Sequence, residues 1–351
     1  MEQRYFGTTK QCQEAQLFTI RNSNGMKISV TDYGSRLVSV HIPDKYGKIR
    51  DIVLGYDCVS QYEKDPYCFG ANIGRNANRI KNAEFVLNGK KYCLSKNEYN
   101  NNSHSGPNGY QFRMWNIEEI DESSIRFLLV SPDLDQGFPG EFTVSVTYTL
   151  TEENEIVIQY TGISTSDTVV NMTHHSYFNL GGHDSGNVLN QYLRIQSALY
   201  SPVSDYQCIP IGKYTEVQGT PMNFLNFKKI GREIEADFVQ LNIAGDYNHN
   251  FILDKDRNAM GLMAEAYCEE SGIYMKAETN LPAMQLYTGA FIDSAEGKNR
   301  CIYEKRSGFC LEAQYTPNAI NSQVGEKPIL KAGERYDKTI RYQFSCRNVI
   351  P

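Results

Sequence analysis

The sequence predicts an all-β protein, a large antiparallel β-sandwich of the kind that can bow one sheet into an open concave groove. Alternation of apolar and polar residues, the pattern of a half-buried strand, recurs along the whole chain, whereas helical periodicity is confined to residues 229–242. Clusters of glycine, asparagine and aspartate separate the alternating runs and supply turns between strands. The clearest runs are MKISVTDYG, RLVSVHI, AEFVLNG, FTVSVTYTL, EIVIQYTG, YLRIQ, HNFIL and GIYMKAET.

The composition suits such a fold. The 351 residues are 40% hydrophobic and include 24 tyrosines and 27 glycines; tyrosine favours strands and glycine favours tight turns. No internal repeat, proline-rich linker or shift of composition marks a boundary within the chain. We therefore expect a single domain spanning residues 1–351.

Charge and cysteine content restrict the partners and the compartment. The net charge of −6 disfavours binding to nucleic acid or to an anionic membrane, since both need clustered lysine and arginine. The N-terminal residues lack the features of a signal peptide, and no later stretch is apolar enough to span a membrane, so we expect a cytoplasmic protein. Nine scattered cysteines, none in a C-x-x-C pair, are expected to be reduced and mostly buried. The sequence does not indicate the oligomeric state.

Residues 169–180, VVNMTHHSYFNL, have the strongest functional pattern. As a strand, this segment would turn a polar or aromatic set of side chains to one face: Asn171, Thr173, His175, Tyr177 and Asn179. The opposite face would carry Met172, His174, Ser176, Phe178 and Leu180. A strand with such a polar front is typical of the wall of a polar cleft. The alternative is an ordinary solvated face on which neighbours satisfy His175.

A second strand, in GFCLEAQYTPNAIN, contains a conspicuous acid. Its alternation buries Phe309, Leu311 and Ala313 and turns Cys310, Glu312 and Gln314 to the other side. A glutamate flanked by apolar residues in mid-strand needs a partner, because an unpaired buried carboxylate is costly and its pKa rises. The alternative is a salt bridge to a lysine or arginine.

Two turn-rich segments add polar candidates. His104 lies in NEYNNNSHSGPNGYQF, and loops on a rigid scaffold commonly carry binding residues, although a solvated loop histidine is the simpler interpretation. GANIGRNANRI contains Arg75, Asn78 and Arg79, and its glycines do not fit a phosphate-binding strand-turn-helix unit. Guanidinium and amide groups suit sugar hydroxyls, but either arginine is equally suited to a structural ion pair.

The remaining histidines do not indicate a metal site. His41 lies in a strand, His183 in a turn and His249 in YNHNF, and each is expected to be a satisfied structural residue. No histidine pair has the one-face spacing of a zinc site, and adjacent His174 and His175 should point to opposite faces of a sheet. We therefore expect no metal.

The ordered set of motifs strongly resembles the aldose 1-epimerase, or galactose mutarotase, family. The likeness begins at TDYGSRLVSVHIPDKYGKIRDIVLGYD and ends at ILKAGERYDKTIRYQF, so it covers nearly the whole chain. Between them, in order, come FGANIGRNANRI, NSHSG, NMTHHSYFNL, TPMNF, QLYTGAF and GFCLEAQYTPNAIN. The resemblance implies a galactose mutarotase-like supersandwich, a free aldose such as galactose or glucose as substrate, no cofactor, and interconversion of α and β anomers.

The resemblance also implies roles for individual residues. Glu312 would remove the proton of the anomeric hydroxyl while His175, protonated when Glu312 is ionised, gives one to the ring oxygen. The ring would open to the aldehyde, rotate about C1–C2 and close as the other anomer. His104 would position the sugar as a hydrogen-bond donor. Further matching sugar contacts are Asn78, Arg79, Tyr177, Asn248 and Gln285, with Arg75 as a supporting residue.

One position departs from the family pattern. Where the family usually has aspartate in a Tyr-Asp-His-Asn-like motif, this chain has Asn248. A charged acceptor makes a hydrogen bond about twice as strong as a neutral one, so the grip on the sugar hydroxyls should weaken. Asp246 would face the same way as Asn248 if both lie in one strand, and it is our candidate for supplying the missing charge.

Two other functions are compatible with the motifs. A sugar-binding protein could keep the groove without catalysis, although such a protein has no need of both His175 and Glu312. An epimerase of phosphorylated or otherwise modified hexoses would need additional basic residues around the groove, and the sequence assigns none. The preferred aldose is not indicated.

Overall fold

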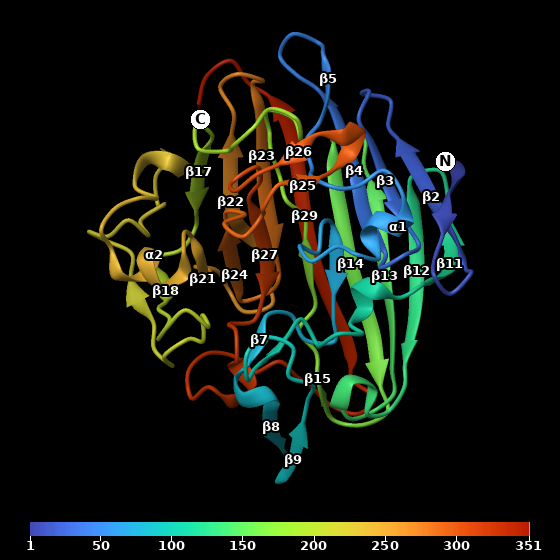
Figure 1. The fold of residues 1–351 in the computed structure, drawn as a ribbon, viewed down its shortest axis with the longest axis vertical. Helices are drawn as coiled ribbons and strands as arrows, with labels where there is room; N and C mark the ends of the chain where they lie inside the picture. The colour runs from blue at the N-terminus through green and yellow to red at the C-terminus, as the bar shows by residue number, and fades with distance from the viewer. Residues whose placement is uncertain (351) are drawn as a thin grey trace.

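The computed structural model describes residues 1–350 and confirms an all-β fold, with 43% of residues in strands and 8% in helices. Figure 1 shows long, nearly parallel ribbons stacked in layers, with the two chain ends on opposite sides at one end of the molecule. No helix among residues 1–350 has the length and apolar character needed to cross a membrane.

The largest sheet is antiparallel throughout, and its two halves come from distant parts of the chain. The last long strand lies at its centre and joins those halves, as the red ribbon in Figure 1 shows. Its nine strands run in the order β11 (Asn116–Ile120), β12 (Ser124–Ser131), β13 (Phe142–Leu150), β14 (Glu155–Ser164), β29 (Arg335–Cys346), β23 (Ile273–Thr279), β22 (Gly261–Tyr267), β17 (Tyr192–Ile195) and β20 (Lys228–Lys229).

Two five-stranded antiparallel sheets complete the main framework. The N-terminal sheet has the order β1 (Glu2–Thr8), β2 (Glu14–Arg21), β3 (Lys27–Thr31), β4 (Arg36–Pro43) and β5 (Ile49–Asp51). The other has the order β19 (Thr215–Glu216), β18 (Leu199–Ser201), β21 (Asn248–Ile252), β24 (Ala283–Tyr287) and β27 (Cys310–Gln314). The second of these sheets carries most of the candidate polar residues.

Short strand pairs and two short helices fill the connections. The pairs are β6 (Ala71–Ile73) with β16 (Thr173–His175), β7 (Arg79–Ile80) with β10 (Asn102–Ser103), β8 (Glu84–Leu87) with β9 (Lys90–Cys93), β15 (Thr168–Val169) with β28 (Ile329–Leu330), and β25 (Ala295–Glu296) with β26 (Ile302–Tyr303). The helices are α1 (Val59–Tyr62) and α2 (Val239–Ala244). The expected helix over residues 229–242 is only partly confirmed, since a 3-10 turn and α2 share that stretch.

The main core lies between the sheets and follows the alternation seen in the sequence. In β13 the side chains of Phe142, Val144, Val146, Tyr148 and Leu150 are all buried and belong to one apolar cluster. That cluster also draws on β2, β3, β12, β14, β22, β24, β27 and β29. Burial of each large apolar side chain contributes about 1.5 to 3 kcal/mol, which makes the sandwich a rigid support for the polar residues on its other faces.

The expectation of mostly buried cysteines is wrong in part. All nine are free, as expected, but only Cys68, Cys208, Cys268 and Cys310 are buried. Cysteine packs as a small apolar residue, yet it is also tolerated at the surface of a reduced protein.

A buried ion pair ties the N-terminal sheet to the loop that follows α1. Arg36 on β4 donates to Asp65 at 2.7 Å, and both side chains are fully buried. Arg36 also donates to the carbonyls of Phe69 and Gln111, while Asp65 accepts the N–H groups of Tyr67 and Phe69. Because every charged atom of Asp65 has a donor, the pair fixes residues 65–69 in place.

We expect Arg36→Met to destabilise the protein by about 3 to 5 kcal/mol, because removing one partner leaves a buried carboxylate without its cation. Denaturant unfolding measures this loss. Arg21→Met is the control, since its pair with Glu2 is more than half exposed and should contribute less than about 1 kcal/mol. Equal effects of the two substitutions would contradict the structural role of the Arg36–Asp65 pair.

Candidate active site

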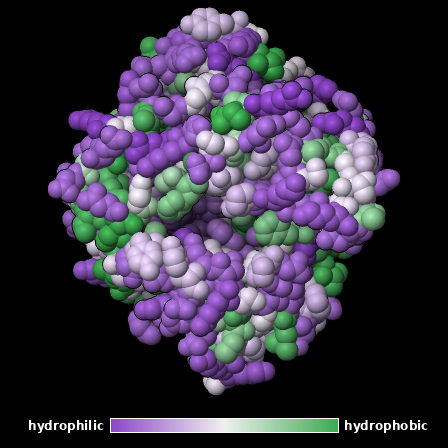
Figure 2. Space-filling view, in the orientation of Figure 1, coloured by the Kyte–Doolittle hydropathy of each residue, from purple (hydrophilic) through white to green (hydrophobic). Residues whose placement is uncertain are grey.

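A polar pocket of about 320 Å³ lies where β7, β16, β24 and β27 meet the loops after α1 and β10. Figure 2 shows a hollow with a hydrophilic interior near the centre of the face, in the region where Figure 1 places β24 and β27. Its size is within the usual range for small-molecule sites. The pocket is lined by Asp65, Pro66, Tyr67, Cys68, Asn78, Arg79, Asn97, Glu98, Ser103, His104, Gly106, Pro107, Gln111, Phe112, His175, Tyr177, Asn248, Tyr287, Phe291 and Glu312.

Glu312 reaches the pocket because β27 alternates as expected. Phe309, Leu311 and Ala313 belong to the main core, whereas Glu312 lines the pocket. Glu312 is only 2% exposed and has no salt bridge to a lysine or arginine within residues 1–350. The alternative of a structural salt bridge is therefore excluded; the nearest opposite partner is an imidazole.

His175 provides that partner. Its Nε2 atom lies 3.7 Å from Oε1 of Glu312, and its Nδ1 atom lies 3.6 Å from the Cys310 sulfur. The ring stacks on Tyr177, with centroids 5.1 Å apart and an interplanar angle of 26°. His175 is thus held by neighbours on several sides while its Nε2 faces the carboxyl group.

The predicted long strand over residues 169–180 is only partly confirmed. Regular pairing is limited to β15 and β16, and isolated bridges at Asn171 and Phe178 continue the path. Every side chain from residue 169 to residue 180 is buried, so neither face is solvated. His174 does point away from the pocket and packs against the rings of Tyr148 and Tyr342.

Asn171 and Asn179 were expected on the polar front but have structural roles instead. Asn171 accepts the N–H of Tyr315 and donates to the carbonyl of Ala77. Asn179 donates to two main-chain carbonyls in neighbouring loops. The polarity of this segment therefore satisfies irregular backbone as well as lining a cleft, a distinction that periodicity alone does not make.

His104 comes from the loop after β10 and lies beside His175, with ring centroids 5.5 Å apart. The main-chain N–H of Asn78 donates to its Nδ1 at 3.3 Å. Burial lowers the pKa of His104 to about 3, so the ring is neutral and its single proton resides on Nε2. His104 is a positioned hydrogen-bond donor.

Burial also pushes the two facing groups toward their neutral forms. It raises the pKa of Glu312 to about 8, and the more distant Arg79 only partly opposes this. Burial, together with the neighbouring His104, lowers the pKa of His175 to about 3. The expected ionised pair is therefore not the form that burial favours in the empty pocket. The neutral pair and the ionised pair contain the same single proton, which rests on Glu312 or on His175.

The ligand atoms of His104, His175 and Glu312 all lie within 4.8 Å of one another, a grouping with the composition of a divalent metal site. Spacing along the sequence did not reveal this, because the three residues come from separate segments. The hydrogen bonding disfavours a metal. A metal-bound imidazole normally donates through its second nitrogen, whereas Nδ1 of His104 accepts from Asn78. The N–H on Nε2 suits a ligand oxygen.

Of the three candidates in GANIGRNANRI, two line the pocket and one does not. Asn78 and Arg79 line the pocket, and the Arg79 guanidinium makes two hydrogen bonds of 2.6 and 2.7 Å to Glu98. Arg75 is not among the lining residues. It is 1% exposed and donates to Ser131 and to the carbonyls of Pro139 and Gly140, so it supports the neighbouring loop.

Tyr177 and Asn248 line the pocket, whereas Gln285 is not among its lining residues. Tyr177 lines the pocket and donates its hydroxyl to the carbonyl of Tyr67. Asn248 also lines the pocket, and its Oδ1 accepts a 2.8 Å hydrogen bond from Nε2 of Gln285. Gln285 itself is beneath the lining, so its first contact is Asn248.

The hypothesis that Asp246 supplies a missing charge is not supported. β21 begins at Asn248, so the two residues do not share a strand. Asp246 is 2% exposed and binds Arg306 at 2.6 and 3.0 Å, with Lys305 3.3 Å away. Its charge is neutralised outside the pocket.

The other histidines have the expected structural environments in part. His183 shares a hydrogen bond of 3.0 Å with the Tyr303 hydroxyl, and His249 accepts the N–H of Asn248. His41 is half-buried on β4, and its Nδ1 has no protein partner. None of the three lines the pocket.

The sequence patterns did not indicate the aromatic rim of the pocket or its acidic residues Asp65 and Glu98. Tyr287 follows Gln285 by two residues on β24 and therefore shares its face, a signal that alternation could have supplied. Phe291 stacks on Tyr287 and is 59% exposed at the mouth. Tyr67, Phe112 and Glu98 lie in irregular segments, where no periodicity indicates direction.

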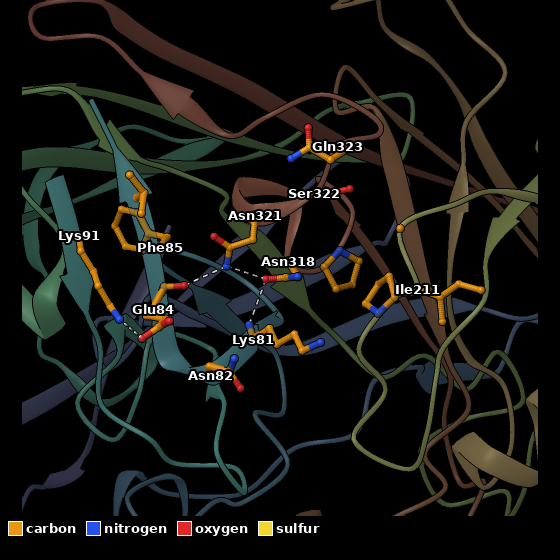
Figure 3. A pocket seen from close by; sticks show the side chains of 14 residues that line it. Lys81, Asn82, Glu84, Phe85, Lys91, Ile211, Asn318, Asn321, Ser322 and Gln323 are labelled. Carbon is orange, nitrogen blue, oxygen red and sulfur yellow. Dashed lines mark hydrogen bonds and ion pairs between the residues drawn. The ribbon is translucent and has the colours of Figure 1, made fainter. Parts of the chain in front are cut away.

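A larger cavity of about 650 Å³ lies elsewhere, beside the β8–β9 hairpin. Figure 3 shows its polar side chains already engaged: Lys91 pairs with Glu84, and Asn318 accepts the main-chain N–H of Lys81 and a hydrogen bond from Asn321. It contains no histidine. The side chains suited to proton transfer, those of His175 and Glu312, lie in the smaller pocket.

The fold and the pocket together define a class. The protein is a β-sandwich whose polar pocket holds a buried carboxyl group beside two imidazoles, an arrangement suited to acid-base chemistry on a neutral polar molecule.

Comparison with known proteins identifies the family. Residues 16–343 match the family model described as aldose 1-epimerase. The chain is 36% identical over 325 residues to a galactose mutarotase of Sus scrofa, covering 92% of each chain, and 35% identical over 334 residues to an aldose 1-epimerase of Escherichia coli, covering 95% of this chain and 96% of that one. An aldose epimerase homologue from C. elegans superimposes with a TM-score of 0.87 at 28% identity, covering 95% of this chain and 99% of its own. The chain belongs to the aldose 1-epimerase family.

Glu312 should make stability depend on pH. Its ordinary pKa is 4.5 and burial raises it to about 8, so folding favours the protonated carboxyl. This contribution is fully present below pH 4.5 and is lost as the pH rises through 8, at about 1.4 kcal/mol per pKa unit. We expect Glu312→Gln to melt at a higher temperature than the wild type at about pH 8.5, and at nearly the same temperature at about pH 5. Calorimetry at the two pH values measures the difference.

The exposed Glu296 provides the matched control, since Glu296→Gln should follow the wild type at both pH values. A melting temperature of Glu312→Gln that exceeds the wild type equally at acidic and alkaline pH would contradict the raised pKa of Glu312.

Proposed function

We propose that this protein is an aldose 1-epimerase that interconverts the α and β anomers of free hexoses such as galactose or glucose, with Glu312 and His175 as its acid-base pair. The observation that carries the proposal is the buried carboxyl group of Glu312, 3.7 Å from His175 in a polar pocket. Membership of the aldose 1-epimerase family supports the same activity.

The reaction needs a base at one oxygen of the hemiacetal and an acid at the other. Glu312 takes the proton of the anomeric hydroxyl and His175 gives one to the ring oxygen, which breaks the bond between C1 and that oxygen. Rotation about C1–C2 turns the other face of the aldehyde to the ring hydroxyl. Reversal of both transfers closes the ring as the opposite anomer. Such proton transfers each contribute about a hundred- to ten-thousandfold to rate.

The single shared proton fits this cycle. Catalysis requires an ionised Glu312 and a protonated His175, whereas burial alone favours the same proton on Glu312. A sugar between the two groups replaces lost hydration with hydroxyl groups, which supports ionisation of Glu312. His104, through its Nε2 proton, is suited to hold the ring oxygen or a neighbouring hydroxyl. Asn78, Arg79, Tyr177, Asn248 and Gln285 remain proposed sugar-binding residues, with Gln285 acting from beneath.

A phosphorylated substrate is less favoured. No lysine lines the pocket, and the Arg79 guanidinium is already paired with Glu98. A phosphate group needs unpaired cationic donors, which this pocket does not offer. A purely sugar-binding protein would gain nothing from burying Glu312 beside His175.

Polarimetry of freshly dissolved α-D-galactose and α-D-glucose tests the activity. We expect optical rotation to reach equilibrium faster with the protein than in buffer alone. Glu312→Gln and His175→Ala should each lower kcat at least about a hundredfold, because each removes one of the two proton-transfer groups. Circular dichroism establishes that the variants are folded.

Glu265→Gln is the matched control. Glu265 is also buried but pairs with Arg194 on the nine-stranded sheet, away from the pocket, so kcat should not change. Normal turnover by folded Glu312→Gln or His175→Ala would contradict their proposed roles, and decay no faster than buffer for the wild type would contradict the activity itself.

The pH profile should report the shared proton. We expect kcat/KM to fall by one proton as the pH rises through about 8, where the pair loses that proton, and to hold through the neutral range down to the acid limb near 3. Rates are taken after subtraction of the buffer-catalysed reaction. If kcat/KM instead decreased as the pH dropped below 6.5, the ordinary pKa of histidine, the pKa of the His175 imidazole would be unperturbed. That result would contradict the buried pair.

Three sequence-based expectations stay predictions: a single domain over residues 1–351, a cytoplasmic location and the absence of a nucleic-acid partner. The main core supports the first, because it draws on strands from the N-terminal, central and C-terminal parts of the chain.

A further inference from the structure

A row of polar side chains crosses the sheet beneath the pocket. Asn250 on β21 lies directly opposite Gln285 on β24, and Gln285 lies directly opposite Glu312 on β27. Directly opposed residues of antiparallel strands place their side chains on the same face, within reach of one another. Asn248 precedes Asn250 by two residues and so faces the same way. All four are at most 7% exposed.

Hydrogen bonding in this row is incomplete in a specific way. Nε2 of Gln285 donates to Oδ1 of Asn248 at 2.8 Å. Oε1 of Gln285, Oε2 of Glu312 and both polar side-chain atoms of Asn250 are buried and have no partner among residues 1–350. Two acceptor oxygens on opposed residues do not bind each other, and leaving either one unsatisfied is unfavourable. A proton on Glu312 removes the conflict, because its O–H can donate to Oε1 of Gln285.

Turning both amides by 180° gives a second arrangement in the same volume, since the amide oxygen and nitrogen exchange places. Nε2 of Gln285 then faces an ionised Glu312, and Oε1 of Gln285 accepts from Nδ2 of Asn248. The Oδ1 atom of Asn248 is thereby released to the pocket. Each arrangement allows Gln285 to hydrogen bond to both Asn248 and Glu312, and the proton on Glu312 distinguishes them.

We propose that Gln285 and Asn248 form an amide relay, in which Asn248 offers an N–H to the sugar while Glu312 is protonated and a carbonyl oxygen while Glu312 is ionised. The relay rests on the proposed function, and it specifies how sugar binding is coupled to the ionisation of Glu312. A sugar hydroxyl that donates to Oδ1 of Asn248 favours the arrangement in which Glu312 is ionised. By reciprocity, sugar binding lowers the pKa of Glu312.

The residue type at position 248 is essential to this device. An aspartate offers only acceptor oxygens, so it would hold Gln285 with Nε2 toward it and Oε1 toward Glu312 in every state. An asparagine can present either polarity. The departure from the family pattern thus exchanges a fixed acceptor for one that responds to the base.

Other titratable groups around Glu312 do not substitute for the relay. His175 and His104 face it across the pocket, and Arg79 is engaged by Glu98. The thiols and phenols nearby have raised pKa values because they are buried, so they stay neutral while Glu312 titrates: Cys68, Cys310, Tyr177, Tyr287 and Tyr342. None of these side chains hydrogen bonds to Asn248 or Gln285.

The test compares kcat and kcat/KM for α-D-galactose across the alkaline limb, because kcat/KM reports the free enzyme and kcat the sugar complex. In the wild type, KM should fall at least about fivefold as the pH rises through the pKa of Glu312, about 8. A fivefold change is the lower end of the usual coupling between two sites. Asn248→Asp fixes the polarity, and Gln285→Met removes the connecting amide at similar volume. In both, KM should become independent of pH.

Ser201 supplies the matched control. It lies opposite Asn250 at the far end of the same buried row, so Ser201→Ala should keep the wild-type dependence of KM on pH. A wild-type KM that does not change with pH would overturn the relay and leave the proposed activity intact. Persistence of the fall in Asn248→Asp would also overturn it, and this nearly isosteric variant decides the matter if Gln285→Met fails to fold. Absence of mutarotation by the wild type would overturn both proposals.

Discussion

The interior position of Glu312 constrains everything around it. A carboxyl group in mid-strand, 2% exposed and without a lysine or arginine partner, raises its pKa unless something stabilises its charge. Among residues 1–350, the basic group closest to its carboxyl is the imidazole of His175, which burial keeps neutral. The pair therefore carries one proton whose position is decided by small changes in its surroundings, which is the condition that acid-base exchange on a neutral molecule requires.

The nearby charges do not hold the shared proton on either Glu312 or His175 alone. Arg79 is held by Glu98, Asp246 by Arg306, and Asp65 by Arg36. In each of these pairs the two charges largely neutralise each other, so no strong electrostatic field from them stabilises Glu312 as a carboxylate. A free cation at the carboxyl group would stabilise its ionised form in the empty pocket and lower its strength as a base. The same neutrality suits an uncharged sugar.

The sequence predicted the fold class and the two central groups for different reasons. In β27 the apolar flanks of Glu312 are regular, so alternation correctly predicted its direction. In residues 169–180 the chain is paired only in short stretches, and Asn171 and Asn179 satisfy irregular backbone, so alternation predicted their roles wrongly. The grouping of His104 with His175 depends on loop geometry that no local pattern encodes. Asp246 failed as a candidate because its partner, Arg306, is distant in sequence.

The asparagine at position 248 is better understood through its neighbour Gln285 than through the ligand. Considered alone, an amide in place of a carboxylate only weakens an acceptor. Considered with Gln285, which bonds to it and lies opposite Glu312, the amide becomes one end of a chain of reversible donors and acceptors that begins at the base. A charge at this point would help to bind hydroxyls but would also oppose ionisation of Glu312 a strand pair away. An amide at this position makes a weaker contact than a carboxylate would and eases ionisation of Glu312, so affinity for the hydroxyls and basicity of Glu312 are both lower while the ionised fraction is higher.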